Sequence, residues 1–361
     1  MKILLLNQFG YASGAPTGRI LAELGAELEQ RGHRVFILTS DSSYGSHRGG
    51  LGRLFQEGLS HLSLFAQSLW HPKVDTVISL TSPACLAVSA GLIARIHRAR
   101  HFHWAMDVYP DVAVRLGELR PGPLVRVLTY LMRRAYEKAD RVVTLDEDMR
   151  EYLNRNHGID SVVIAPFPPE IKWPAIEENS PSTKQWLYSG NFGRAHEIQA
   201  LLEIQKKLEQ QKVNAHLILQ GQGPQFLLSQ EQATRLELRQ VQWRAPVPVK
   251  MLGEALLHSD VLVVTRKAEM KGLLLPSKLL LAELSGRRIL WIGDTDGATA
   301  QKLSRQGRHG VFAVDEIDAI AQWLRGCFNG ESSDAAIEPA PIDFVRRQAF
   351  QQWDILLTAR N

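Results

Sequence analysis

Short apolar runs alternate with amphipathic stretches through the first half of the chain. Six runs indicate buried strands, because each is four to six residues long and rich in β-branched side chains: 2–6, 34–39, 76–80, 101–106, 141–145 and 162–165. Apolar positions recur at helical spacing between them, in 18–31, 51–70, 84–98, 122–138 and 147–156. Strands that alternate with helices in this way predict a parallel sheet covered on both faces.

The alternation stops at residues 166–184, which hold five prolines and predict a linker. It then restarts with strands expected at 185–190, 215–220, 239–243, 260–265, 288–293 and 311–314. Helices are expected at 196–211, 248–258, 276–286, 298–307 and 316–328. We therefore predict two doubly wound, Rossmann-like α/β domains, residues 1–167 and 168–341, that face each other across a cleft. A last helix, 342–358, is expected to carry 342–361 back onto the first domain.

Composition excludes several classes of protein. The 361 residues include only two cysteines, Cys85 and Cys327, too few for a disulfide framework. No run of 18 apolar residues is long enough to span a membrane, and a net charge of +4 is too small to indicate nucleic acid. The start, MKILLLN, predicts a strand rather than a secretory signal, so we expect a cytoplasmic protein.

The charge is unevenly distributed. Residues 95–134 hold eight arginines against three acidic residues, and the stretches 51–70 and 122–138 are amphipathic. This pattern suits an anionic partner, either a phosphorylated substrate or a phospholipid surface on the inner face of the cell membrane to which the protein attaches peripherally. The alternative is that the charges lie on solvated helix faces and that both helices only cover the core.

Glycine-rich loops follow the first strand of each predicted domain. The first, FGYASGAPTGR, lacks the nicotinamide and Walker fingerprints but places Gly14 and Gly18 before a helix. The second, SGNFGRAHE, places Gly193, Arg194 and His196 before another helix. Exposed amides and an arginine at a helix start suit a diphosphate. The alternatives are an ordinary turn for the first loop and a first-turn position for His196.

A third loop, VVTRKAEMKGLLLPSK, ends at the start of a helix. It contains Glu269, which could accept hydrogen bonds from sugar hydroxyls, and then Ser277 and Lys278. A lysine at a helix N-terminus opposes the helix dipole, and an anion bound there removes the conflict. The alternative is a surface cluster of ion pairs.

Four segments in this order resemble the retaining, nucleotide-sugar-dependent glycosyltransferases of family 4, with the GT-B fold, in the branch for bacterial polysaccharide, O-antigen and exopolysaccharide assembly. They are HWAMDVYPDVAVRLG (103–117), YSGNFGRAHE (188–197), EMKGLLLPSK (269–278) and LSGRRILWIGDTDGAT (284–299). The resemblance implies transfer of a sugar from a nucleotide-diphosphate donor to a lipid-linked or saccharide acceptor. It implies no cofactor and no metal, although Asp294 and Asp296 mimic a D-x-D spacing.

The resemblance also implies roles for single residues. Arg194 and Lys278 would hold the donor diphosphate, and Glu269 would contact the donor sugar as a catalytic residue. Asp107 would be the catalytic group on the acceptor side. The remaining donor-binding positions are Gly14, Gly18, Gly193, His196 and Ser277.

The family pattern has a second glutamate, eight residues after the one that corresponds to Glu269. This chain departs from the pattern there, because the position is Ser277 or, in another alignment, Leu281. Arg288 also replaces a usual proline. Two alternatives therefore stay open: a non-catalytic GT-B protein that acts as a binding or partner subunit, and another GT-B nucleotide-sugar enzyme such as an epimerase or an inverting transferase.

Overall fold

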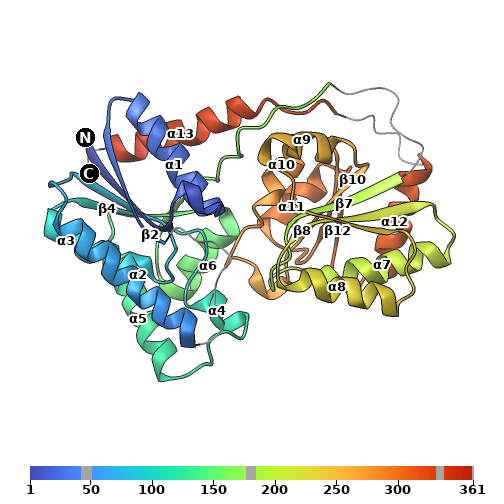
Figure 1. Cartoon of the computed structure of the whole chain (residues 1–361), viewed down its shortest axis with the longest axis horizontal. Coiled ribbons are helices and arrows are strands. Elements are labelled where there is room, and N and C mark those ends of the chain that lie inside the picture. Colours follow the sequence, from blue (N-terminus) through green and yellow to red (C-terminus); the bar gives the residue numbers. More distant parts are fainter. Residues whose placement is uncertain (42–50, 176–183, 331–336, 360–361) are drawn as a thin grey trace. The chain divides into compact units, whose positions relative to one another are not determined.

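The computed structural model describes residues 1–41, 51–175, 184–330 and 337–359, which form two units (Figure 1). Unit 1 contains Met1–Phe167, the short segment Gly272–Leu275 and the chain from Arg347 onward. Unit 2 contains Pro168–Lys271 and Pro276–Arg346. Each unit is built around its own six-stranded parallel sheet, as the alternating pattern predicts.

The sheet of unit 1 has the strand order β2-β1-β3-β4-β5-β6. Its strands are β1 (Lys2–Phe9), β2 (Arg34–Asp41), β3 (Thr76–Ser79), β4 (Arg100–Trp104), β5 (Arg141–Thr144) and β6 (Ser161–Val163). Each of the six lies on one of the runs expected to be a strand. Leu4 and Leu6 face one side of the sheet and Leu5 the other, as the two-residue period of a strand requires.

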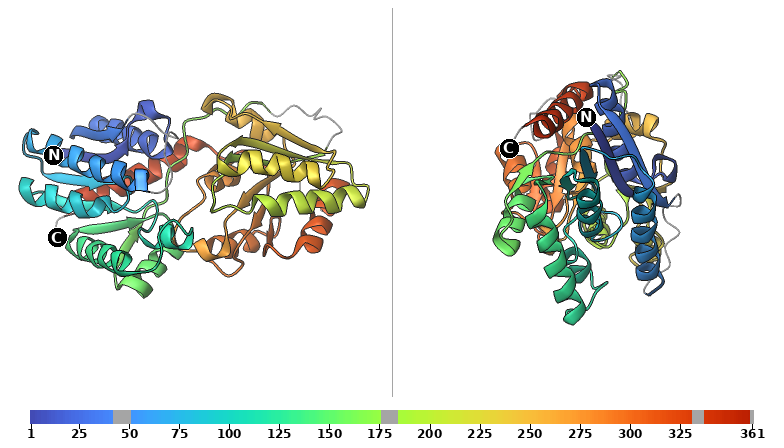
Figure 2. Two further views of the ribbon diagram at one scale, coloured as in Figure 1. Left: turned by 60° about the horizontal axis from the view of Figure 1, so that its bottom comes forward. Right: turned by 90° about the vertical axis from the view of Figure 1, so that its left-hand side faces the viewer.

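Helices cover both faces of this sheet (Figure 2). The helices of the unit are α1 (Pro16–Gln30), α2 (Leu51–Leu69), α3 (Leu86–His97), α4 (Asp111–Arg115), α5 (Pro123–Lys138) and α6 (Glu147–His157). α2 and α3 pack on the side of Leu4 and Leu6. α1 packs on the side of Leu5, where Gly25 lets the helix approach the Leu5 and Ile37 side chains closely.

The sheet of unit 2 has the order β12-β11-β10-β7-β8-β9. Its strands are β7 (Lys184–Asn191), β8 (Ala215–Gln222), β9 (Val241–Arg244), β10 (Val261–Thr265), β11 (Arg288–Ile292) and β12 (Gly310–Phe312). Taken in chain order this is the 3-2-1-4-5-6 arrangement of dinucleotide-binding sheets, read from the other edge. The two parallel sheets with their flanking helices confirm the predicted fold class.

The helices of unit 2 are α7 (Ile198–Gln210), α8 (Pro224–Arg235), α9 (Val249–Leu257), α10 (Lys278–Leu284), α11 (Ala298–Arg305) and α12 (Ile317–Asn329). α7 and α12 pack together over a core that includes Trp186 and Tyr188 of β7. α8 is absent from the sequence prediction. Its inward face has little apolar character, since Ser229 and Ala233 are its only buried residues.

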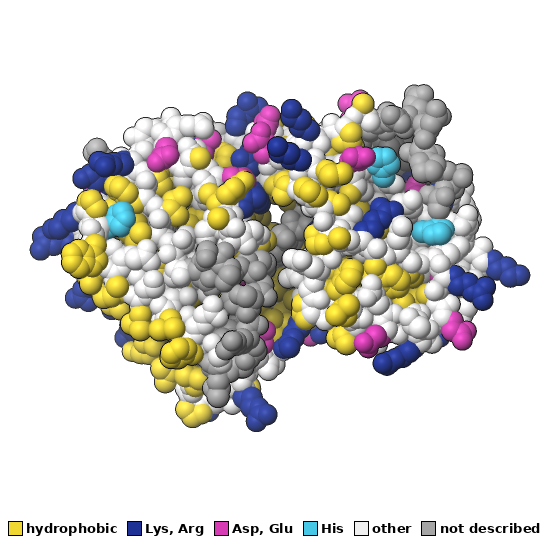
Figure 3. Space-filling model, in the orientation of Figure 1, with side chains coloured by type: hydrophobic (Ala, Val, Ile, Leu, Met, Phe, Trp, Pro, Cys, Tyr) yellow, Lys and Arg dark blue, Asp and Glu magenta, His cyan; other side chains and the backbone are white. Residues whose placement is uncertain are grey.

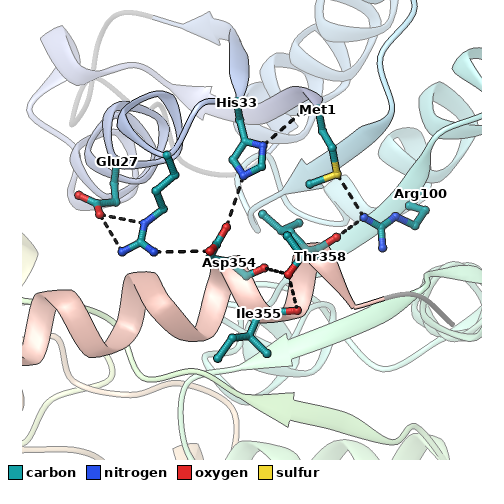
Figure 4. Close-up of polar contacts among 9 residues, drawn as sticks. Met1, Glu27, His33, Arg100, Asp354, Ile355 and Thr358 are labelled. Atoms are coloured by element: carbon teal, nitrogen blue, oxygen red, sulfur yellow. Dashed lines mark hydrogen bonds and ion pairs between the residues drawn. The ribbon is translucent and has the colours of Figure 1, made fainter.

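The last helix, α13 (Ile342–Thr358), enters unit 1 at Arg347. Trp353 is fully buried against Trp104 of β4, with ring centroids 4.9 Å apart. Asp354 lies 3.5 Å from an Arg31 nitrogen and 3.4 Å from Nε2 of His33 (Figure 4). Arg100 donates to the Ala359 carbonyl. These contacts hold α13 against β4 and against the turn between α1 and β2.

The predicted linker, 166–184, contains neither helix nor strand over residues 166–175. Residues 176–183 lie outside the described chain. A second polar stretch, residues 329–341, precedes the last helix in the sequence, and its residues 331–336 also lie outside the described chain. Among the described helices, none combines the length and the apolar character that a membrane span needs.

Candidate functional site

The topology of unit 2 brings two of the predicted loops together. β7 lies between β8 and β10, so the direction of the chain through the sheet reverses between β7 and β10. Ligands of open α/β sheets bind at such a point, outside the carboxyl ends of the strands. His196 Nδ1 donates to the Thr265 carbonyl across 2.6 Å, and the Glu197 N–H donates to Thr265 Oγ1 across 3.2 Å. These bonds tie the loop after β7 to the end of β10.

Lys278 is the most unusual side chain at this site. Its ammonium nitrogen is buried and has no hydrogen-bond partner in the described part of the chain. It lies 3.8 Å from the ring centroid of Tyr188, and a Cβ at Gly190 would come within 3.0 Å of its Cε. Burial lowers the pKa of Lys278 well below its usual value. A buried cation without an anionic partner is costly, and an anion bound beside Lys278 would offset that cost.

The β7 loop carries two further polar residues, His196 and Arg194. Burial, together with the charge of Lys278, lowers the pKa of His196 to about 3, so its ring is neutral. Because Nδ1 carries the proton shared with Thr265, Nε2 remains as an acceptor. Arg194 is exposed on the same loop, one turn before α7 begins at Ile198. A guanidinium and free helix amides are both suited to phosphate.

The third predicted loop supplies polar groups beside the lysine. Glu269 is exposed in a short 3₁₀ helix, Ala268–Met270. Burial raises the pKa of Glu197, and the negative charge of Glu269 raises it further. Ser277 is exposed at the N-cap of α10, and its side chain makes no capping bond. Unit 2 therefore brings Gly193, Arg194, His196, Glu269, Ser277 and Lys278 to the carboxyl side of one sheet.

Sequence reasoning missed two glycines at the same edge. Gly221 has φ +147°, and a Cβ there would lie 1.9 Å from the Gly190 carbonyl oxygen; at Gly223 it would lie 2.4 Å from Asn191 Oδ1. They permit close packing of the β7 and β8 ends. A glycine–any residue–glycine–proline run, 221–224, at a strand end before a helix was the available signal.

A cavity of about 450 Å³ opens beside these glycines, at the carboxyl ends of β8 and β9. Its lining includes Gly223, Phe226, Gln230, Trp243, Arg244 and Pro246. The volume lies within the range of small-molecule sites, and the lining combines aromatic faces with amide and guanidinium groups.

The two aspartates with D-x-D spacing are engaged in ion pairs. Asp294 is buried and lies 2.6 Å from an Arg266 nitrogen, and Asp296 lies 2.8 Å from Lys271 Nζ. Nowhere in the described ranges do three or more metal-ligating side chains converge on one point.

The remaining predicted residues belong to unit 1. Gly14 is exposed, with φ +73°, at the end of a short 3₁₀ helix that precedes α1. Gly18 is buried in the first turn of α1, where a Cβ would lie 2.3 Å from the Gly10 carbonyl oxygen. Both glycines are at the carboxyl end of β1, beside the reversal of chain direction between β1 and β3.

Asp107 follows β4 at the same edge of the unit 1 sheet. Its N–H and that of Met106 both point to Thr81 Oγ1, at 3.4 and 2.7 Å, and its backbone forms an antiparallel bridge with Leu274 of the same unit. Burial raises the pKa of Asp107 to about 6. Such a carboxyl group can exchange a proton near neutral pH.

Fold and site together define a class of protein. The chain contains two doubly wound units. At the carboxyl edge of its sheet, the second unit has glycine turns, a cavity at the ends of β8 and β9, and, at the switch point, a buried lysine without a hydrogen-bond partner in the described chain. This combination is typical of proteins that bind a nucleotide through its phosphates.

Comparison with known proteins narrows the class. Residues 17–170 match the model of the glycosyl transferase 4-like domain, and residues 170–275 match that of glycosyl transferases group 1. A putative colanic acid biosynthesis glycosyl transferase of Escherichia coli K12, WcaI, is 23% identical over 265 residues, which are 69% of this chain and 62% of the relative. The chain thus matches less than two thirds of that relative's length.

Solved structures agree in fold. WaaG, a glycosyltransferase involved in lipopolysaccharide biosynthesis, superposes with a TM-score of 0.71 at 14% identity, over 99% of this chain and 100% of that one. Anabaena HepE in complex with UDP-glucose gives 0.68 at 16% identity, over 98% and 99%. The chain belongs to the family 4-type glycosyltransferases, whose two domain models match it in succession over residues 17–275, and it has the GT-B fold.

Proposed function

We propose that this protein transfers a sugar from a nucleotide-diphosphate donor to a saccharide or lipid-linked acceptor, with retention of configuration and without a metal. The observation that carries the proposal is the buried, unpaired Lys278 ammonium at the switch point of unit 2. In this proposal the donor diphosphate pairs with the ammonium group. HepE, which shares the fold, was crystallised with UDP-glucose, and this supports a uridine nucleotide as the first donor to test.

The proposed arrangement follows the order of groups along the sheet edge. The nucleoside occupies the cavity at the ends of β8 and β9, lined by Trp243 and Arg244. The diphosphate lies against Lys278, Arg194 and the amides that open α7. The donor sugar extends toward Glu269, whose carboxylate accepts hydrogen bonds from sugar hydroxyls. Asp107 of unit 1 is proposed to act on the acceptor side.

In this arrangement Lys278 and Arg194 stabilise the negative charge of the leaving group. Departure of the nucleoside diphosphate concentrates negative charge on the phosphate oxygens. Preorganised donors aimed at that charge accelerate the reaction, and removal of one typically costs about 10²–10³ in rate. His196 is neutral, so it contributes an acceptor rather than a third positive charge.

A thermal-shift screen against UDP-, GDP-, ADP- and dTDP-sugars tests the proposal. A donor at one hundred times its dissociation constant stabilises the folded state by about 2.7 kcal/mol. The donor that stabilises is then assayed for hydrolysis and transfer, with and without EDTA, and the anomeric form of the product is read by NMR. An inverted product, or activity that EDTA abolishes, refutes the corresponding part of the proposal.

A second candidate is a non-catalytic binding or partner subunit. Ser277 favours it, since the family pattern has a glutamate at that position in one alignment. This candidate predicts that a donor binds and that neither hydrolysis nor transfer follows with any acceptor tested.

A further inference from the structure

The outward face of α2 in unit 1 is apolar instead of polar. Phe55, Leu59, Leu62 and Leu69 recur every three to seven residues along one side of the helix, and Trp70 follows its end. Their exposed fractions are 70%, 50%, 67%, 55% and 91%. The opposite side of the same helix is already buried, at Ser60, Leu64 and Ser68. This helix therefore has two apolar or uncharged sides, and the core uses only one.

The neighbouring helices extend this surface. α2 packs against α3 and α3 against α5, and the His97 ring of α3 lies 3.1 Å from the Ser68 carbonyl of α2. Leu92 and Ile96 of α3 are exposed, as are Leu124 and Val127 of α5. We call the outward sides of these three helices the α2–α3–α5 face. Figure 3 shows hydrophobic side chains gathered over these helices at the lower left of the view.

Positive charge accompanies the apolar residues. Residues 55–70, 86–98 and 123–138 contain six lysines and arginines and two glutamates. One of the two, Glu137, is 3.0 Å from Arg133 and 3.2 Å from Arg134. Arg95, Arg98 and Arg126 are exposed, and Trp70 and Tyr130 supply exposed aromatic rings.

We infer that the α2–α3–α5 face docks on an anionic lipid bilayer. Exposed leucines and a tryptophan insert at the boundary between headgroups and acyl chains, and flanking arginines attract anionic lipid. A second copy of this chain fits less well, because each copy would bring the same positive charge to the contact. The inference deepens the proposed function, since a lipid-linked acceptor would then be met at the membrane surface.

Co-sedimentation of the full chain with lipid vesicles tests the inference. We expect binding to vesicles of phosphatidylcholine with phosphatidylglycerol, little binding to pure phosphatidylcholine, and release by high salt. Leu62→Ser with Trp70→Ser should weaken binding about tenfold or more, because both side chains lose their apolar contact with lipid. Arg95→Gln with Arg126→Gln should weaken it about fivefold for each charge removed.

Matched controls are available in the same unit. Ile355 of α13 is 59% exposed and lies outside the face, so Ile355→Ser should leave vesicle binding unchanged. Arg155 of α6 is exposed, and Arg155→Gln should do likewise. Unchanged binding in the Leu62 and Trp70 variant overturns the inference. A wild-type dimer that this variant converts to a monomer, without vesicle binding by either, also overturns it.

UDP affinity, measured by calorimetry on the same variants, separates the two proposals. The variants of the face should bind UDP as the wild type does. Vesicle binding without any donor binding would refute the proposed function and leave the membrane face intact. Donor binding without any vesicle binding would refute the membrane face and leave the proposed function intact.

Discussion

Lys278→Met is the substitution that most directly tests the proposed donor site. Methionine has a similar length and keeps the contact with the Tyr188 ring, but it carries no charge. The variant should have two effects of opposite sign. The free protein should be as stable as the wild type or more stable, and its affinity for UDP should fall.

The magnitudes follow from the surroundings of the ammonium group. In the described chain the Lys278 ammonium group contacts the Tyr188 ring, 3.8 Å from its centroid, and such an interaction is worth up to about 2 kcal/mol when desolvated. The effective cost of burying an ion is several kcal/mol, so removal of the charge does not destabilise the fold. In the complex, a charged hydrogen bond to phosphate contributes about 1.5–3 kcal/mol, which corresponds to a loss of about 10- to 150-fold in UDP affinity.

Isothermal titration calorimetry with UDP and thermal unfolding measure these two effects. Lys207→Met is the matched control, because Lys207 forms a surface ion pair with Asp318 on the helix layer of the same unit. It should leave UDP affinity unchanged. The reasoning is refuted if Lys278→Met lowers Tm by several degrees while UDP binds as tightly as before, since the lysine would then have a purely structural role.

Four further predictions concern the same site and its neighbours. Arg194→Gln should weaken UDP binding about tenfold or more by calorimetry without a change in Tm, because the side chain is exposed. Gly221→Ala should cost more than about 1 kcal/mol in urea unfolding, because its φ is +147° and a Cβ would lie 1.9 Å from the Gly190 oxygen. Asp107→Asn should slow sugar transfer and leave the affinity for UDP unchanged. In the wild type, the transfer rate should rise with pH through about 6 as the Asp107 carboxyl group ionises. A variant with the wild-type rate and pH profile would refute a catalytic role for Asp107. EDTA should leave transfer unchanged, and a loss that Mg²⁺ restores would contradict the metal-free proposal.

Apolar periodicity predicted every strand and most helices of the described chain, and its errors have physical causes. β1 runs to Phe9, beyond the expected end at residue 6, because Asn7 and Gln8 are polar but buried. The side-chain amide nitrogen of Asn7 donates to the Phe9 carbonyl and to Thr17 Oγ1, so this nitrogen has hydrogen-bond partners inside the unit. A hydropathy pattern contains no information about such partners.

The candidate site was predictable to the extent that it depends on local signals. Arg194 and Lys278 stand next to glycines and helix starts, which the sequence displays directly. The contact between Lys278 and the Tyr188 ring joins residues far apart in the chain, as does the bond between His196 and Thr265. These pairs arise from the order of strands in the sheet, which is a property of the folded chain rather than of any one loop.

The structure also clarifies what the departure at the second family glutamate means. Leu281 is buried in α10, so an alignment that places the glutamate there would put a carboxylate in the core. Ser277 is exposed at the start of the same helix, beside Lys278, and is the position compatible with a ligand contact. A hydroxyl in place of a carboxylate replaces a charged hydrogen bond of about 1.5–3 kcal/mol with a neutral one of about 0.5–1.5 kcal/mol. The expected consequence is about a tenfold weaker hold on the donor. In the proposed arrangement, Lys278 and Arg194 supply the positive charge that the leaving diphosphate requires, and both residues are present. The serine therefore predicts a raised KM for the donor rather than a protein without catalysis.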